Sequence, residues 1–265
     1  MRKTLIITIL LIVISFLSIT LVQAKIDKDI DSELPQVSGT YDVPGHPNLK
    51  LKVFVHEPKI KLEPSVSPSL VCSLTDPDSS AVVDPAGWHL PSGQWVYRLN
   101  TASVPSSVGS SNFSTLAQLA FSVWQNAVNN KVTFVAGPTT TVNRAKYDGQ
   151  NIITWGRTSG SALAITYTWY DQNTGVVAET DTIMNKKFPW SWTDQLDPQT
   201  QNCADANSYD AQDILTHELG HWMGLDDEYT SSYVDNTMYG YGSKGEVKKD
   251  TLTNGDVTGV SNIYQ

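Results

Sequence analysis

Alternation of hydrophobic and polar positions marks several of the strands that this chain is expected to form. Residues Leu49–His56, LKLKVFVH, alternate regularly and predict one strand within a region otherwise rich in loops. Three further runs, at residues 148–156, 161–171 and 175–185, are rich in β-branched and aromatic residues and are bounded by glycine and aspartate. These runs predict three strands with hairpin connections in the middle of the chain.

A helical period replaces the alternation near residue 208. The apolar stripe of the predicted helix consists of Ala211, Leu215, Leu219 and Trp222. The adjacent face carries Asp210, Ile214, His217, Glu218 and His221. Ser208 fits the N-cap position, because a serine hydroxyl can accept a hydrogen bond from a free amide of the first turn. One face of this helix is therefore expected to pack and the other to carry chemistry.

The polar face of this helix has the residue types of a catalytic zinc site. His217 and His221 are four positions apart, so their imidazoles lie one turn apart on the same face and can reach one tetrahedral Zn²⁺. Glu218 points beside the metal rather than at it, which suits a carboxylate that takes a proton from metal-activated water. The spacing predicts two metal ligands and a general base.

A third ligand is expected after the end of the helix. Gly224 comes three residues after His221 and can adopt the positive φ that ends a helix and turns the chain back. The turn would return Asp227 towards the metal, with Asp226 as the next choice. Three protein ligands leave a fourth position for water or a substrate carbonyl, which is the arrangement of catalytic rather than structural zinc.

The run His217–Asp227, HELGHWMGLDD, resembles the extended motif HExxHxxGxxH/D of the metzincin metallopeptidases. Met238 follows eleven residues later in NTMYGYG, which resembles the Met-turn beneath their zinc. The closing residues 252–265 are similar to the last helix of matrixin catalytic domains. Upstream, residues 95–100, 116–127 and 131–137 follow the matrixin order of strand, long helix, strand. The similarity covers residues 87–265.

The resemblance implies an α+β fold for residues 87–265. Its expected parts are a twisted mixed sheet, a long helix in the N-terminal half, a zinc-binding active-site helix and a C-terminal helix. Met238 is implied as a polarizable floor under the ligands rather than as a ligand. Most matrixins have histidine at the third ligand position, so Asp227 here is similar to the snapalysin-type members of the clan.

The resemblance also suggests where a substrate binds. In the matrixin order Ala162–Thr168 is the antiparallel edge strand, to which an extended peptide could add, with Ala162, Leu163 and Ala164 as candidate contacts. Tyr241 lies where matrixins place a wall of the specificity pocket, although glycine replaces their proline in this segment. A covered edge without a ligand is the alternative.

One zinc ion per chain is expected. Matrixins carry a second, structural zinc held by additional histidines before the edge strand, whereas residues 138–216 here contain no histidine. The chain has only three other histidines, His46, His56 and His89, and all precede the first expected helix. Residues 171–175, DQNTG, have the oxygen-rich composition of a calcium loop, but a simple hairpin turn is favoured there.

The first 24 residues have the pattern of a secretory signal peptide. Arg2 and Lys3 precede an apolar run at residues 5–22, and residues 22–24, VQA, supply a small-residue cleavage site. We therefore expect a secreted, extracellular protein. Because the apolar run is about 18 residues long, near the lower limit for crossing a bilayer, an uncleaved signal anchor is the alternative.

The charge balance limits the partners of the mature chain. Removal of residues 1–24 takes away two basic and no acidic residues, which leaves 16 basic and 27 acidic residues and a net charge of −11. Such an acidic balance argues against nucleic acid or an anionic membrane as a partner.

Residues 25–86 differ in composition from the rest, with a charged start and many prolines. We expect a propeptide or a small accessory β-rich region, with a loosely ordered linker as the alternative. The two cysteines of an exported chain favour a disulfide between Cys72 and Cys203. The alternative is the cysteine of matrixin propeptides, whose thiolate blocks the zinc, although CSLTDPD around Cys72 matches that motif poorly.

These patterns and the resemblance together imply a secreted zinc-dependent endopeptidase that acts on a protein or peptide, with Glu218 as general base. Two alternatives stay open: an exported non-catalytic zinc-containing binding protein, and a metal-dependent amidase of cell-wall peptides. Glu218 argues against the first, because a structural zinc site has no use for an unliganded glutamate beside the metal. The second shares the chemistry and differs only in its substrate.

Overall fold

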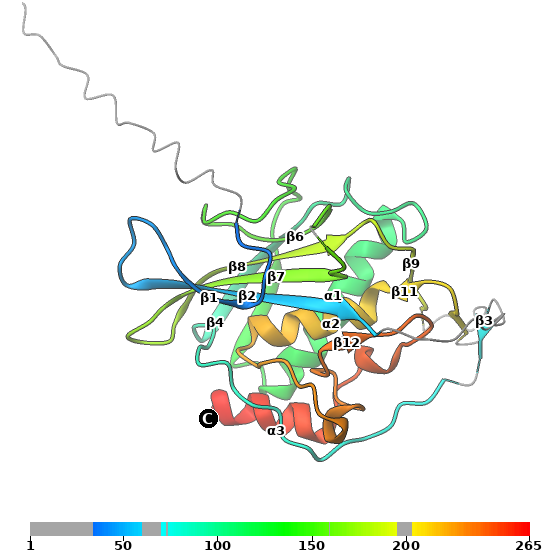
Figure 1. Ribbon diagram of the computed structural model, residues 1–265. Coiled ribbons are helices and arrows are strands. Elements are labelled where there is room, and N and C mark those ends of the chain that lie inside the picture. Colours follow the sequence, from blue (N-terminus) through cyan, green and yellow to red (C-terminus); the bar gives the residue numbers. More distant parts are fainter. Residues whose placement is uncertain (1–33, 60–69, 73, 159, 195–202) are drawn as a thin grey trace, which may run out of the picture. The chain divides into compact units, whose positions relative to one another are not determined.

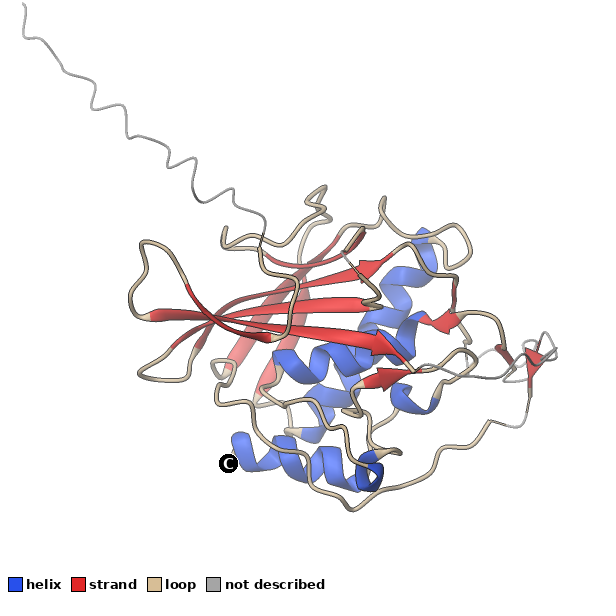
Figure 2. Cartoon of the chain, viewed as in Figure 1, coloured by secondary structure: helices blue, strands red, loops and turns tan. Residues whose placement is uncertain are grey.

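The hydrophobic runs of the sequence form the strands of one mixed sheet, drawn in red in Figure 2. The computed structural model describes residues 34–59, 70–72, 74–158, 160–194 and 203–265 (Figure 1). The longer strands are β1 (Gly39–Asp42), β2 (Leu49–Pro58), β4 (Gly93–Leu99), β5 (Val132–Ala136), β6 (Asn151–Gly156), β7 (Ala164–Asp171) and β8 (Val177–Asn185). Two-residue strands are β3 (Leu70–Val71), β9 (Trp190–Ser191), β10 (Ala204–Asp205), β11 (Tyr209–Asp210) and β12 (Tyr241–Gly242).

The strand order of the main sheet is β1-β2-β7-β8-β6-β4-β5, with β12 paired to β2. Strands β5, β4, β6 and β8 run parallel to one another, whereas β7 is antiparallel to β8 and to β2. The strands predicted at residues 49–56, 95–100 and 131–137 are confirmed, as are those in the three β-rich runs. The expected hairpin is present between β7 and β8 but not between β6 and β7, because β6 pairs in parallel with β8. The fold is the expected α+β type with a mixed sheet.

Strand β7 is not an edge strand, so the expectation for Ala162–Thr168 is wrong. Strand β2 pairs with β7 in an antiparallel ladder from Leu49 opposite Asp171 to His56 opposite Ala164. The alternation along β2 explains the pairing, because one face of the strand joins an apolar cluster with β7. Its buried members are Leu51, Val53, Ala162, Ile165, Tyr167, Trp169 and Ile183. The edge of β7 is therefore covered, which was the alternative expectation, and the strand that covers it is β2 of the same chain.

The described residues before residue 87 are joined to the rest of the fold. Strands β1 and β2 lie in the main sheet, and the described residues from Leu34 to Gln265 make up one compact unit. The predicted signal peptide lies outside the described residues. Among the residues described, no helix has both the length and the apolar character needed to cross a bilayer.

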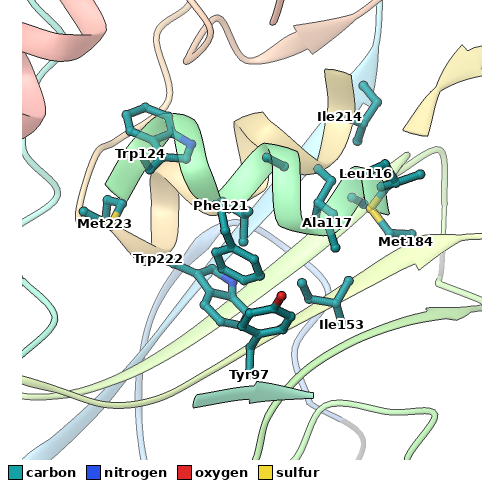
Figure 3. Close-up of a cluster of buried hydrophobic side chains, with 14 of the residues drawn as sticks. Tyr97, Leu116, Ala117, Phe121, Trp124, Ile153, Met184, Ile214, Trp222 and Met223 are labelled. Carbon is teal, nitrogen blue, oxygen red and sulfur yellow. The ribbon is translucent and has the colours of Figure 1, made fainter. Parts of the chain in front are cut away.

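The helices lie on one side of the sheet (Figure 2). They are α1 (Ser110–Ala127), α2 (Ala211–Trp222) and α3 (Asn254–Ile263), with short 3-10 turns at Ser231–Tyr233 and Lys248–Asp250. Helix α1 begins before the predicted start at residue 116, and α2 and α3 occupy the predicted places. Figure 3 shows side chains of α1 and α2 packed together with residues of the sheet, among them Phe121, Trp222 and Ile153.

Asp210, rather than the predicted Ser208, is the N-cap of α2. The Asp210 carboxylate accepts hydrogen bonds from the amides of Gln212 and Asp213, which lack partners within the helix. The Ser208 hydroxyl is instead bonded to the hydroxyl of Ser191, next to the short pairing of β9 with β11. The helix therefore starts two residues later than a serine cap would require.

Three buried tryptophans fix the position of α2 through their indole N–H groups. Trp124 of α1 donates to the carbonyl of Thr216 at 2.8 Å, and Trp88 donates to the carbonyl of His221 at 3.1 Å. Trp222 of α2 itself donates to the hydroxyl of Thr182 on β8 at 2.9 Å. Because each indole is satisfied only in one orientation, these bonds set the place of the helix as well as filling the core.

The predicted disulfide between Cys72 and Cys203 is confirmed. It lies beside the antiparallel pairing of β3 with β10, where Ala204 is opposite Val71. Both thiols are thereby consumed, so Cys72 is not the zinc-blocking thiolate that was the alternative. The bond ties the segment after β2 to the segment before α2.

Two buried carboxylates on β8 hold the loop that leads into β6. Asp181 accepts hydrogen bonds from the amides of Lys146 and Ile152, each at 3.0 Å, and Glu179 accepts one from the amide of Asp148 at 2.9 Å. Burial raises the pKa of Glu179 to about 7.

The protein should therefore become less stable as the pH rises, because of Glu179. Its folded-state pKa lies above the unfolded value, so between about pH 4.5 and 7 the folded protein holds a proton that the unfolded chain has released. The free energy of unfolding should drop by on the order of 2 kcal/mol across this window through this group. Glu179→Gln should reduce that drop, measured by urea unfolding from pH 5 to 8. The exposed Glu57→Gln is the control, and equal slopes in both variants would contradict the expectation.

The turn that ends α2 requires glycine for two reasons. Gly224 has φ of +96°, as the sequence predicted, and a Cβ there would lie 2.1 Å from the carbonyl oxygen of Trp88. Gly93 has φ of +101° with open space around it.

Gly224→Ala should therefore destabilise the fold more than Gly93→Ala. In both variants an alanine must adopt a positive φ, which costs about 1 to 2 kcal/mol. Only Gly224→Ala must also displace the backbone of Trp88. We expect a difference of at least about 2 kcal/mol between them in chemical unfolding. Equal losses would show that the close approach at Gly224 contributes nothing.

Candidate metal centre

Three of the predicted ligands converge at the C-terminal half of α2. The Nε2 atoms of His217 and His221 lie 3.1 Å and 3.5 Å from Oδ1 of Asp227. All three atoms are buried, and among the described residues none of them finds a hydrogen-bond partner of normal geometry. Buried polar atoms without partners are costly, and here they face one another. Two imidazole nitrogens and one carboxylate oxygen in this arrangement fit a Zn²⁺ ion.

Backbone carbonyls orient both imidazoles. Nδ1 of His217 lies 2.8 Å from the carbonyl oxygen of Thr237, and Nδ1 of His221 lies 3.0 Å from that of Leu225. A carbonyl can only accept, so each Nδ1 carries the proton and each Nε2 keeps its lone pair for a metal. The two histidines are thus held in the tautomer that metal binding requires.

Asp227 faces the histidines and Asp226 does not. Burial alone would raise the pKa of Asp227, but the neighbouring His221 and His217 lower it well below its usual range, so the group stays ionised. The Tyr229 hydroxyl donates to the second oxygen of Asp227 at 3.1 Å. The Asp226 side chain is 40% exposed and lies 4.0 Å from the ammonium of Lys52.

Glu218 lies beside the three ligand atoms and is fully buried. Its Oε2 accepts a hydrogen bond from the Thr166 hydroxyl on β7 at 2.6 Å, and its Oε1 lies 3.1 Å from Nδ1 of His56 on β2. Burial raises the pKa of Glu218 to about 7. A carboxyl group with such a pKa can exchange a proton with its surroundings near neutral pH.

The turn that contains Met238 lies directly under α2. A Cβ on Gly220 would come within 2.1 Å of the Met238 sulfur, so glycine lets the helix approach this side chain closely. Asp256, in the first turn of α3, accepts hydrogen bonds from the amides of Thr237 and Met238 at 3.0 Å and 3.2 Å. The same turn supplies the carbonyl that orients His217. Met238 itself is buried and packs in the core, as expected for a floor under the ligands.

Four residues were expected to contact a substrate, and three of them, Leu163, Ala164 and Tyr241, are bonded to or paired with β2 instead. The amide of Leu163 donates to the carbonyl of His56 at 2.7 Å, and Ala164 pairs with the same residue. Tyr241 in β12 pairs with Glu57 of β2 in parallel. Ala162 is buried, and its carbonyl accepts a hydrogen bond from the Asn185 side chain.

Residues 171–175 form the hairpin turn between β7 and β8 that the sequence favoured over a calcium loop. Asp171 Oδ1 accepts hydrogen bonds from the amides of Asn173 and Thr174 at 2.8 Å and 3.0 Å. This oxygen is therefore already engaged by the backbone of the turn.

Several residues of the site are missing from the sequence prediction. They are His56, Thr166, Tyr229, Asp256 and Lys249, whose ammonium lies 3.4 Å from Nε2 of His56. His56 ends the alternating run of β2, and the alternation places its side chain on the same face as that of Phe54, which was a usable signal. Lys249 is fully buried although it lies between Lys248 and Asp250, so nothing local distinguishes it from a surface lysine.

A second group of potential ligands overlaps the first. His56, His217 and Glu218 also bring one ligand atom each within 4.8 Å of one another. In that group His56 and Glu218 are bonded to each other and Glu218 also to Thr166, whereas the three atoms of the group with Asp227 have no hydrogen-bond partner among the described residues, so the group with Asp227 is the better zinc site.

Comparison with known proteins agrees with this geometry. The family model described as Matrixin matches residues 88–265, which include the helices, the Met238 turn and all three converging ligands. No curated protein matches the chain. The match covers well over half of the chain, and the resemblance seen in the sequence is thereby confirmed: the chain belongs to the matrixin family.

Proposed function

We propose that this protein is a secreted zinc-dependent endopeptidase. Membership of the matrixin family makes it a zinc metallopeptidase that acts on proteins or peptides. Our proposal adds the cleavage of internal peptide bonds, the export of the chain and the roles of individual residues. The observation that carries it is the convergence of three buried, unpaired ligand atoms of His217, His221 and Asp227 beside Glu218.

His217, His221 and Asp227 would hold the ion, and one coordination position would stay open. When bound, zinc supplies a Lewis acid that polarises the scissile carbonyl and lowers the pKa of the attacking water. Oε1 of Glu218 accepts the proton of that water and passes it to the leaving amine. The hydrogen bond from Thr166 to Oε2 keeps the carboxylate in place for both transfers.

The disulfide supports export. Cysteine pairs persist in oxidising compartments, and both cysteines of this chain are consumed in the bond between Cys72 and Cys203. The signal-peptide pattern of residues 1–24 points the same way. The acidic net charge argues against nucleic acid as a partner.

Glu218→Gln should abolish hydrolysis without loss of the metal. The amide keeps the shape of the side chain but cannot accept the proton, so we expect a fall in kcat of at least about 10³-fold on casein. Zinc content by mass spectrometry should stay at one ion per chain, and the exposed Glu57→Gln should retain activity. Undiminished hydrolysis by the Glu218→Gln variant would remove this carboxylate from the proposed role.

Tyr229→Phe should weaken zinc binding through Asp227. Loss of the hydroxyl removes the hydrogen bond that holds the carboxylate towards the histidines, and losses of this kind cost roughly tenfold or more in metal affinity. Competition with a chromophoric chelator measures the zinc Kd directly. Tyr239→Phe removes a neighbouring hydroxyl and should leave that Kd unchanged; equal Kd values in the unsubstituted protein and both variants would contradict the positioning role.

A further inference from the structure

Strand β2 covers the edge of β7 beside the candidate metal centre. It pairs antiparallel with β7 along residues 49–56 and parallel with β12 at residues 57–58 (Figure 1). Extended peptides commonly bind proteins by adding a strand to an open sheet edge. Without β2, the edge of β7 would be open beside the candidate metal centre. The chain thus supplies its own extended segment to this edge.

Two side chains of β2 lie directly on the metal ligands. The ring of Phe54 stacks on that of His221, with centroids 3.7 Å apart and planes inclined by 5°. The ring of His56 lies 3.9 Å from that of His217. Alternate residues of a strand point to the same face, so Phe54 and His56 both face α2. Both are buried, as are the two histidines beneath them.

His56 fills a polar pocket next to the general base. Its Nδ1 lies 3.1 Å from Oε1 of Glu218, and its Nε2 lies 3.4 Å from the ammonium of Lys249. That ammonium donates to the carbonyls of Tyr239 at 2.6 Å and Tyr241 at 3.0 Å. The imidazole therefore takes up the oxygen that would accept the proton of the attacking water. His56 is fully buried in this position.

We propose that residues 49–58 are an internal, peptide-like ligand of the catalytic cleft, and that hydrolysis requires this strand to leave. The proposal rests on the proposed function, because it concerns access to the same site. It differs from a thiolate that caps the metal, since both cysteines are paired and the blocking groups are an aromatic ring over His221 and an imidazole on Glu218.

The covalent arrangement allows the strand to leave alone. Residues 34–59 carry β1 and β2, whereas the chain from Cys72 onwards is fastened by the disulfide to Cys203. The segment at residues 81–86 is bonded to the C-terminal part as well: Ala81 accepts from Asn236, and Ala86 donates to Gly224. One cut between residues 59 and 70 would therefore free β1 and β2 while the remaining segment stays attached.

The test uses the full chain with a recognition sequence for a specific protease placed between residues 59 and 70. Before the cut we expect slow hydrolysis of casein and slow removal of zinc by a chelator. After the cut and loss of residues 34–59, verified by mass spectrometry, both rates should rise at least tenfold. A synthetic peptide of residues 39–58 should reverse both effects. The same peptide with His56→Ala and Phe54→Ala should reverse them at least tenfold less effectively.

The matched controls separate this proposal from the proposed function. The uncut protein and the cut Glu218→Gln protein are compared for zinc removal, which needs no catalysis. Suppose that zinc leaves the cut protein faster, but that cut protein with Glu218 intact does not hydrolyse casein. That result would support the proposed internal ligand and overturn the proposed endopeptidase activity. Equal rates of hydrolysis before and after loss of the fragment would overturn the proposed internal ligand, whereas the proposed endopeptidase activity would stand.

A fragment that stays bound after the cut also gives a result. In that case His56→Ala with Phe54→Ala is introduced into the cut chain, where loss of both ring contacts should release the strand and speed zinc removal at least tenfold. The exposed Thr40→Ala on β1 is the control. Unchanged zinc removal in the double variant, with the fold intact by circular dichroism, would overturn the proposal.

Discussion

The geometry of the site depends on two hydrogen bonds from imidazole Nδ1 atoms to backbone carbonyls. His217 is oriented by Thr237 and His221 by Leu225, and both carbonyls come from the chain that follows α2 rather than from the helix itself. The first of these carbonyls is held in turn by Asp256 of α3, whose carboxylate binds the amides of the same turn. The C-terminal helix therefore supports the metal ligands through the turn at Thr237 and Met238.

The same helix that carries the ligands is surrounded by other fixed groups. Its start is capped by Asp210, and its end is determined by the conformation of Gly224. Indole hydrogen bonds from Trp88, Trp124 and Trp222 fix its place against the core, which Figure 3 shows in part. A site that must hold three ligand atoms within a few ångströms needs such support, because small displacements of the helix would separate them.

The predictable part of the site was the part encoded locally. The spacing of His217, Glu218 and His221 on one helix, the turn at Gly224 and the return to Asp227 follow from backbone geometry over eleven residues. The position of β2 did not follow, because its partner strand begins more than 100 residues later and the resemblance implied an open edge at that place. Lys249 was missed because nothing in the sequence around it distinguishes it from a surface lysine. Asp256 was missed because its bonds to the amides of Thr237 and Met238 reach back 18 to 19 residues.

The most direct measurement is the position of zinc in a crystal of the full chain, located by anomalous scattering at the zinc absorption edge. The geometry predicts one peak within about 2.0 to 2.2 Å of Nε2 of His217, Nε2 of His221 and an oxygen of Asp227. A peak bound instead by His56, His217 and Glu218, or no peak in protein that had been supplied with zinc, would contradict the assignment of the ligands.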